Sequence, residues 1–233
     1  MSRFSALGAS PVGLRRPARR QRPGRRVAQL FGSTLLVAGL ILIAVIGVRL
    51  LRGAVARERA RTEWTRIVAA AKLSTLATLE QRRVPSGRPV VRVVIPSIRL
   101  DEVVVEGIGD KDLWAGPGHM PGTVFPGQPG NAVISAHRDR HFHRLDDVRI
   151  GDVIETQTPQ RDVMWRVTER RVVMRDERVI FNTADPVLTL TTCWPTRYLG
   201  PAPERLLLTA VPVSIRERGT TSATSVEGDS VSQ

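Results

Sequence analysis

Three side chains of this sequence have the types that nucleophilic catalysis by a thiol requires. Cys193, the only cysteine in the chain, ends a run of strand-forming residues. His137 ends a second run, NAVISAH, and Arg205 begins a third, RLLLTA. A thiol nucleophile needs a base that takes up its proton and a donor that stabilises the negative charge formed on attack. Histidine and arginine can supply these roles if the fold brings the three strand ends together.

Each of these residues also has an ordinary structural interpretation. A lone cysteine is most often a small buried core residue, and a histidine at a strand end is usually a surface or hydrogen-bonded residue. An arginine that opens a strand is usually a solvated edge charge. A single cysteine cannot form an intramolecular disulfide, so a domain exported with this sequence must be stable on its core alone. The chemistry therefore depends on how the three positions are arranged.

The elements that would position these residues are short strands. Runs such as VVRVVI, NAVISA and VLTLTTC are rich in valine, isoleucine and threonine, and glycine, proline, aspartate and asparagine separate them. No long amphipathic helix is expected between them, and one helical turn is expected near HFHRLDDV. This pattern predicts a mostly β, mostly antiparallel barrel or sandwich over residues 88–215. A domain of that size can bury its own core.

The N-terminal region predicts a membrane anchor. Residues 1–26 contain eight arginines and no acidic residue, which accounts for much of the net charge of +13. The nineteen residues from Leu30 to Val48 carry no charge, and a helix of that length spans about 28 Å, close to the thickness of the bilayer core. We expect a signal-anchor helix over residues 27–51, with the basic segment cytoplasmic and the rest outside the membrane. A cleaved signal peptide is the alternative.

The stalk, the C-terminal tail and the expected partners are predicted from composition. Residues 52–87 mix alanine, leucine, arginine and glutamate until VPSGRP, so they predict a helical stalk or linker. Residues 216–233 are polar and rich in serine and threonine, which is typical of a disordered tail. The basic stretch has no interleaved aromatic residues and precedes a membrane span, so the expected partner is the membrane and no nucleic acid is expected.

A metal site is a further alternative for the histidine-rich segment HRDRHFH. His137, His141 and His143 are close enough in sequence to share an ion. The remaining histidine, His119, lies far away along the chain, and the nearby aspartates would complete a site only in a favourable fold. We therefore predict no metal.

Two longer segments resemble the motifs of a known enzyme family. GPGHMPGTVFPGQPGNAVISAHRD contains GTxxPGxxGNxxIxxHRD, and TLTTC is followed twelve residues after the cysteine by an arginine. Together they resemble the sortases, membrane-anchored cysteine transpeptidases of bacterial cell surfaces, over about residues 90–213. The resemblance implies an eight-stranded β-barrel and no cofactor. It assigns catalytic roles to His137, Cys193 and Arg205, and substrate or oxyanion binding to Thr192.

The same resemblance implies the reaction. A sortase cleaves an LPxTG- or LPxTA-like sorting signal after threonine through a thioacyl intermediate on cysteine. It then transfers the secreted protein to an amine of a peptidoglycan precursor or a pilin. The alternatives are a non-catalytic membrane-anchored envelope domain with Cys193 buried, and a cysteine protease that transfers the acyl group to water.

Within the family, the segments HRDRHFHRLDDVRIGD and TCWPTRYLGPAPERLLLTA look most like class D. Class E is second, because a tyrosine commonly precedes PGT there and this chain has Met120. Trp194 stands where class D often has tyrosine.

Overall fold

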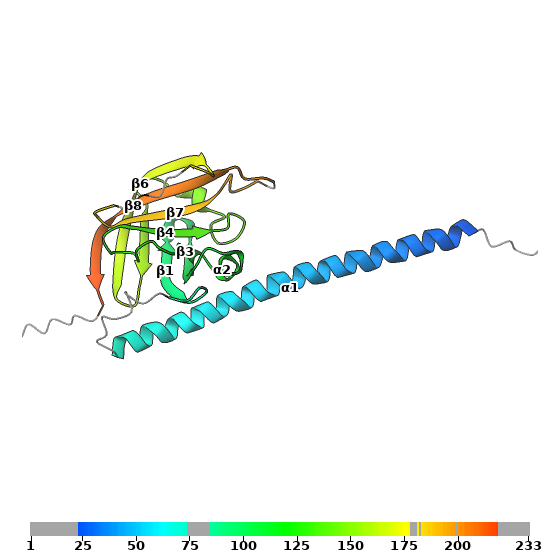
Figure 1. Ribbon diagram of the computed structural model, residues 1–233, viewed down its shortest axis with the longest axis horizontal. Helices are drawn as coiled ribbons and strands as arrows, with labels where there is room; N and C mark the ends of the chain where they lie inside the picture. Colours follow the sequence, from blue (N-terminus) through cyan, green and yellow to red (C-terminus); the bar gives the residue numbers. More distant parts are fainter. Residues whose placement is uncertain (1–22, 74–83, 178–180, 182, 199, 219–233) are drawn as a thin grey trace, which may run out of the picture. The chain divides into compact units, whose positions relative to one another are not determined.

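A computed structural model describes residues 23–73, 84–177, 181, 183–198 and 200–218 (Figure 1). The chain divides into two units, one over residues 1–49 and one over residues 50–233. Residues 1–22 of the predicted cytoplasmic segment and residues 219–233 of the predicted tail lie outside the described residues, as do residues 74–83 of the predicted stalk.

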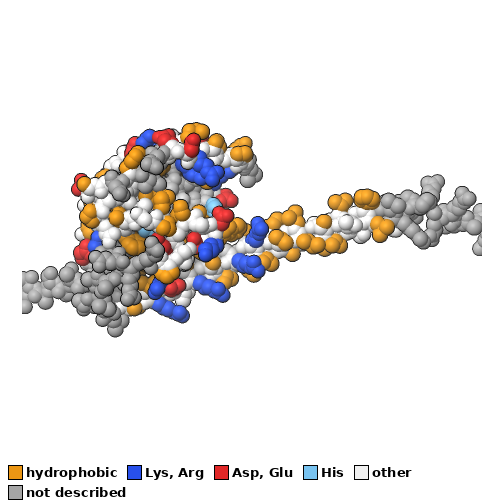
Figure 2. All heavy atoms as spheres, in the orientation of Figure 1, with side chains coloured by type: hydrophobic (Ala, Val, Ile, Leu, Met, Phe, Trp, Pro, Cys, Tyr) orange, Lys and Arg blue, Asp and Glu red, His pale blue; other side chains and the backbone are white. Residues whose placement is uncertain are grey.

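Helix α1 (Pro23–Leu73) contains the apolar segment that the sequence predicts to span a membrane. Its large apolar residues from Leu30 to Leu51 are exposed. Figure 2 shows hydrophobic side chains covering the visible face of this part, followed by basic side chains. Among the described residues, α1 is the one helix long and apolar enough to cross a membrane. The alanine, leucine, glutamate and arginine content explains why the helix continues beyond the apolar segment.

Eight strands form a closed barrel, as the family resemblance implied. The strands are β1 (Pro89–Ile95), β2 (Leu100–Glu106), β3 (Gly118–His119), β4 (Asn131–Ala136), β5 (Val153–Gln157), β6 (Arg161–Met174), β7 (Val187–Trp194) and β8 (Glu204–Glu217). Their order around the barrel is β1-β2-β3-β4-β7-β8-β6-β5. The prediction of a mostly β fold is confirmed, and β8 ends two residues beyond the predicted domain boundary at 215.

Most neighbouring strands are antiparallel, but two pairs are parallel. β2 pairs with β3, and β4 pairs with β7 over the whole length of β4. A parallel pair places the ends of both strands, and the loops that follow them, on the same side of the sheet. The β4–β7 pair therefore brings residues that follow Ala136 close to residues that follow Thr192.

The barrel interior is filled by one apolar cluster. Its fully buried members include Trp165, Phe142, Ile134, Leu190 and Leu208. Alternate residues of the first half of β6 are buried, as expected for a strand with one face toward the core. The Trp165 indole N–H donates to the Thr156 hydroxyl at 2.8 Å, which satisfies its polar atom inside the barrel.

The remaining elements are short. The 3₁₀ turns are η1 (Pro96–Ile98) and η2 (Leu145–Asp147), and η2 is the helical turn expected near HFHRLDDV. Helix α2 (Asp110–Ala115) was not predicted from the sequence. The short strand β3 begins with Gly118 and passes very close to the end of β2. A glycine is required there because a Cβ at this position would overlap the carbonyl of Gly107.

Candidate active site

Cys193 and Arg205 lie opposite one another on the antiparallel strands β7 and β8. The Arg205 guanidinium donates a hydrogen bond from Nη1 to the Cys193 Sγ at 2.8 Å. The cysteine is partly exposed, which does not fit the alternative of a buried structural thiol. A permanently charged donor at this distance can stabilise negative charge on the sulfur or on an oxygen that forms beside it.

Strand β7 carries Cys193 from the core to the surface. The residues from Leu188 to Thr192 are buried, whereas Cys193 and Trp194 are half-buried. The strand pairs with β4 on one side and β8 on the other. Because both edges are hydrogen-bonded and the preceding side chains are packed, the backbone that presents the thiol is held in place.

Thr192 links the two parallel strands. Its side chain is 1% exposed, and its hydroxyl donates to the Ala136 carbonyl at 2.8 Å. The role of Thr192 in binding substrate or the oxyanion therefore stays a prediction. In this structure the hydroxyl joins the strand end before Cys193 to the strand end before His137.

His137 is the first residue after β4. Because β4 and β7 are parallel and Ala136 pairs with Thr192, His137, directly after β4, and Cys193, the next residue of β7, lie on the same side of the barrel. Adjacent strands lie about 4.8 Å apart, so the two backbones are close at this point. His137 is half-buried. The structure thus brings all three predicted catalytic residues to one region, with Cys193 and Arg205 in direct contact.

The turn after His137 is fixed by its own backbone. The His137 carbonyl accepts hydrogen bonds from the Arg140 N–H at 3.3 Å and the Phe142 N–H at 3.2 Å. Phe142 and Leu145 are fully buried in the barrel core. The position of His137 therefore depends on how the whole turn is anchored.

Arg138 is a residue whose role the sequence did not reveal. Its guanidinium donates to the Pro195 carbonyl at 2.6 Å and to the Gly200 carbonyl at 2.5 Å. It therefore ties the turn that follows His137 to the connection between β7 and β8. The sequence indicated only that Arg138 lies directly after His137. Its acceptors are backbone carbonyls, which every residue has, so no pattern of side chains predicts the contacts.

A second bridge joins the same two loops. The Arg197 Nη2 lies 2.5 Å from the Asp147 Oδ1 and 4.0 Å from the Asp146 Oδ1. Asp146 and Asp147 belong to η2, at the end of the segment that begins with His137. The turn after His137 and the connection between the strands that carry Cys193 and Arg205 are thus held together by arginine contacts.

The histidines of HRDRHFH have separate partners. His141 lies against Glu102, and His143 contacts the Arg140 carbonyl through Nδ1 at 2.7 Å. His119, elsewhere in the barrel, contacts Glu106 at 2.7 Å. Within the part of the chain that the structure describes, no three histidine, cysteine, aspartate or glutamate residues are arranged to hold a metal ion.

Comparison with known proteins identifies relatives of this chain. A family model described as "Sortase domain" matches residues 93–213. Sortase D of Bacillus subtilis (strain 168) is 31% identical over 116 residues, which cover 49% of this chain and 59% of that relative. The chain therefore matches less than two thirds of the relative's length.

Solved structures show the same fold. A Sortase D5 transpeptidase of Clostridium perfringens superposes with a TM-score of 0.59 at 21% identity, covering 68% of this chain and 99% of that chain. A sortase E of Streptomyces avermitilis gives a TM-score of 0.50 at 23% identity, covering 57% of this chain and 93% of that chain. Both classes considered from the sequence are therefore among the structural neighbours.

The buried His141 makes the stability of the barrel depend on pH. Burial lowers the pKa of His141 from 6.5 to about 4, and the charges of Arg57 and Arg140 act in the same direction. The Glu102 carboxylate near His141 is already paired with the Arg57 guanidinium. Between pH 4 and 6.5 the unfolded chain therefore binds a proton at this position that the folded chain does not. The free energy of unfolding should fall as the pH falls through this window.

We predict that His141→Gln reduces this pH dependence. Between pH 7 and pH 4.5 the wild-type chain should lose about 2 kcal/mol more unfolding free energy than the variant. Chemical denaturation of both full chains in detergent micelles at the two pH values measures the difference. His143→Gln, at an exposed histidine, is the control. Equal pH dependence in wild type and His141→Gln would contradict the neutral, buried state.

Removing the Arg138 guanidinium should loosen the connection between β7 and β8. Arg138→Met deletes two hydrogen bonds to backbone carbonyls while keeping an apolar stem, and amide exchange at Thr196 and Arg197 should accelerate by about tenfold. Hydrogen exchange followed by mass spectrometry measures it. Arg149→Met, at an exposed arginine, is the matched control. Unchanged exchange at both amides would show that Arg138 does not hold this loop.

Proposed function

The chain belongs to the sortase family, and from this premise we propose that it is a membrane-anchored sortase that joins secreted proteins to an amine of the cell envelope. Members of the family are cysteine transpeptidases. The observation that carries the proposal is the 2.8 Å contact between the Cys193 sulfur and the Arg205 guanidinium. His137 lies at the end of the strand beside them, so a nucleophile, a cation and a proton carrier share one region.

The first half-reaction forms a thioester. The Cys193 thiolate attacks the threonine carbonyl carbon of an LPxTG- or LPxTA-like signal, and a C–S bond forms. Arg205 donates to the tetrahedral oxyanion that develops beside the sulfur. The peptide C–N bond then breaks, and His137 transfers a proton to the leaving amine. The N-terminal part of the secreted protein stays on Cys193 as an acyl group.

The second half-reaction transfers the acyl group to an amine. His137, now deprotonated, takes a proton from the incoming amine, which attacks the thioester carbonyl. An amide bond forms, the C–S bond breaks, and the Cys193 thiolate is restored. Because one amide replaces another through an activated thioester, the reaction requires no external energy source and no cofactor. The acceptor is an amine of a peptidoglycan precursor or a pilin.

The proposed location suits these substrates. In our proposal the apolar part of α1 spans the cell membrane once, the arginine-rich N-terminus is cytoplasmic, and the barrel lies outside. Sorting-signal proteins and lipid-linked wall precursors are held at the same membrane. Anchoring the enzyme there therefore raises the effective concentration of both substrates at its site.

Class D is the class that we propose. The pattern F-x-x-L over residues 142–145 and the pattern Y-x-G-x-A-P-x-R over residues 198–205 resemble class D and support it. The curated relative with 31% identity is a Sortase D. Class E is the second candidate, since a sortase E is among the structural neighbours.

The proposal predicts a cysteine-dependent transfer reaction. The full chain in detergent micelles is incubated with fluorogenic LPxTG, LPxTA and LAxTG peptides, with and without an acceptor amine. Wild type should join the acyl part to the amine, and Cys193→Ala should not. Arg205→Met should lower kcat/KM by at least about 100-fold, because it removes the charged oxyanion donor. Arg216→Met, at an exposed arginine on the same strand, should stay within about twofold as the control.

The other outcomes separate the alternatives. Cleavage with water as the sole acceptor at every amine concentration would favour the cysteine protease. No cleavage of any peptide, together with a Cys193 thiol that resists a methanethiosulfonate reagent, would favour the non-catalytic envelope domain. Equal activity of Arg205→Met and Arg216→Met would overturn the role assigned to Arg205.

A further inference from the structure

One face of α1 packs against the barrel. Gly53, Arg57, Ala60, Trp64 and Val68 are spaced by three or four residues, so they lie on the same side of the helix. Gly53, Ala60 and Trp64 are buried, although most of their neighbours in this part of α1 are exposed. All five residues belong to the same unit as the barrel. We call residues 53–68 the docking segment.

The apolar part of the docking segment covers the outside of β2. Ala60, Trp64 and Val68 form a cluster with Val103 and Val105. Trp64 is 6% exposed, whereas a tryptophan on a free helix would be largely in water. Burial of such a ring removes apolar surface from water and therefore favours packing of the segment on the barrel.

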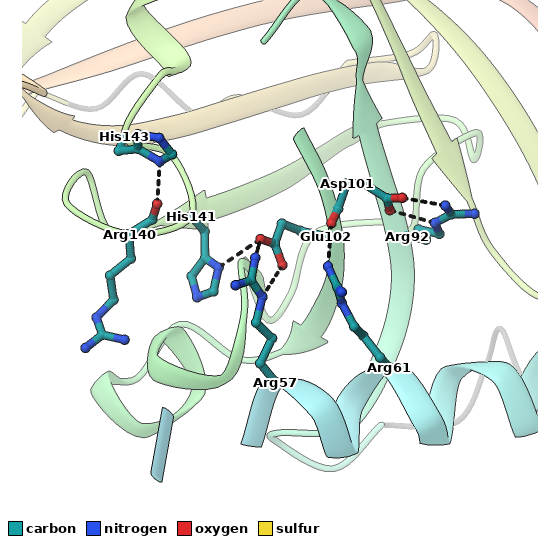
Figure 3. Close-up of polar contacts among 8 residues, drawn as sticks. All are labelled: Arg57, Arg61, Arg92, Asp101, Glu102, Arg140, His141 and His143. Atoms are coloured by element: carbon teal, nitrogen blue, oxygen red, sulfur yellow. Dashed lines mark hydrogen bonds and ion pairs between the residues drawn. The ribbon is translucent and has the colours of Figure 1, made fainter. Parts of the chain in front are cut away.

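A partly buried ion pair lies beside this cluster. The Arg57 Nε donates to the Glu102 Oε2 at 3.0 Å, and Arg57 Nη2 contacts the other carboxylate oxygen (Figure 3). The Glu102 side chain is 7% exposed. A buried carboxylate without a partner is strongly destabilising, so Glu102 requires the arginine from α1. Arg61 adds a hydrogen bond to the Asp101 carbonyl at 3.0 Å.

Glu102 also faces the turn that follows His137. The His141 Nδ1 lies 3.5 Å from the Glu102 Oε1, so the carboxylate stands between α1 and this turn (Figure 3). Arg140 of the same turn stacks on the Trp114 ring, with its guanidinium carbon 3.5 Å from the ring centroid. A Cβ at Gly53 would lie 3.2 Å from the Arg140 Nη1 and 3.4 Å from the Trp114 ring. The docking segment therefore approaches the turn directly at Arg140 and through Glu102 at His141.

These two residues are connected to the His137 backbone. Arg140 donates its N–H to the His137 carbonyl, and His141 is followed by Phe142, whose N–H donates to the same carbonyl. A shift of the turn by a fraction of an ångström would therefore be transmitted to His137. Catalytic groups misplaced by about 1 Å lose as much as 100-fold in rate.

We propose that the docking segment of α1 is required for full catalytic activity, and that Arg57 and Glu102 are positioning residues for His137. The proposal rests on the proposed function, because His137 needs an accurate position only if it transfers protons. In this proposal the juxtamembrane helix has a second role besides membrane attachment, because its docking segment supports the turn that follows His137. The competing explanation is that the docking segment only adds stability.

The test compares variants of the full chain in detergent micelles. Arg57→Met removes the charge and keeps the apolar stem, Glu102→Gln removes the buried carboxylate charge, and the double variant removes both. Arg59→Met, at an exposed arginine two residues along α1, is the matched control. The readouts are kcat and KM for peptide transfer, measured well below the melting temperature, and the NMR signals of ¹³C-labelled histidine rings.

We expect Arg57→Met to lower kcat by about tenfold with KM unchanged within about twofold, because His137 is displaced without loss of peptide binding. The His137 ring signal should shift in Arg57→Met and stay in place in Arg59→Met. The double variant should be less impaired than the sum of the single variants, since it leaves no unpaired buried charge.

An unchanged His137 signal and an unchanged kcat in Arg57→Met, together with a lower melting temperature, would overturn the proposal in favour of a purely stabilising segment. Failure of the proposed function is recognised separately. In that case wild type transfers no peptide, whereas the NMR comparison of Arg57→Met with Arg59→Met still decides whether the docking segment positions the His137 turn.

Discussion

The parallel pairing of β4 with β7 is the constraint on which the candidate site depends. Because Ala136 lies opposite Thr192 in a parallel pair, the residues that come next, His137 after β4 and Cys193 near the end of β7, lie at the same end of the sheet. An antiparallel pairing of the same two strands would place these residues at opposite ends of the sheet. The antiparallel partner of β7 on its other side, β8, then brings Arg205 to the cysteine.

The surroundings of the site hold its two loops against one another. Arg138 fixes the connection between β7 and β8 through two carbonyls, while Phe142 anchors the turn after His137 in the core. The contact of Arg57 with Glu102 extends this support to the juxtamembrane helix. In a site whose chemistry needs three groups in a fixed arrangement, such support matters as much as the reacting side chains.

The sequence predicted the strands and identified His137, Cys193 and Arg205 as candidate site residues, but its strand-forming runs alone did not separate a barrel from a sandwich. The motif resemblance supplied the eight-stranded barrel, which the structure confirms. The parallel β4–β7 pair joins residues 131–136 to residues 187–192, and local patterns carry no information about such distant pairing. The contact of Arg57 with Glu102 could not be predicted either, because an arginine in a charged helix is normally solvated. Short elements such as α2 were missed because six residues show no periodicity.

The thioacyl intermediate on Cys193 is tested most directly by rapid-quench intact mass spectrometry of the full chain mixed with the sorting peptide that it cleaves best. We predict that the acyl mass appears on the intact chain before the joined product does, and that peptide mapping places it on the fragment containing Cys193. Added amine should remove this adduct at the rate at which the joined product forms. Product that forms without an adduct, or an adduct on any other residue, would contradict this prediction.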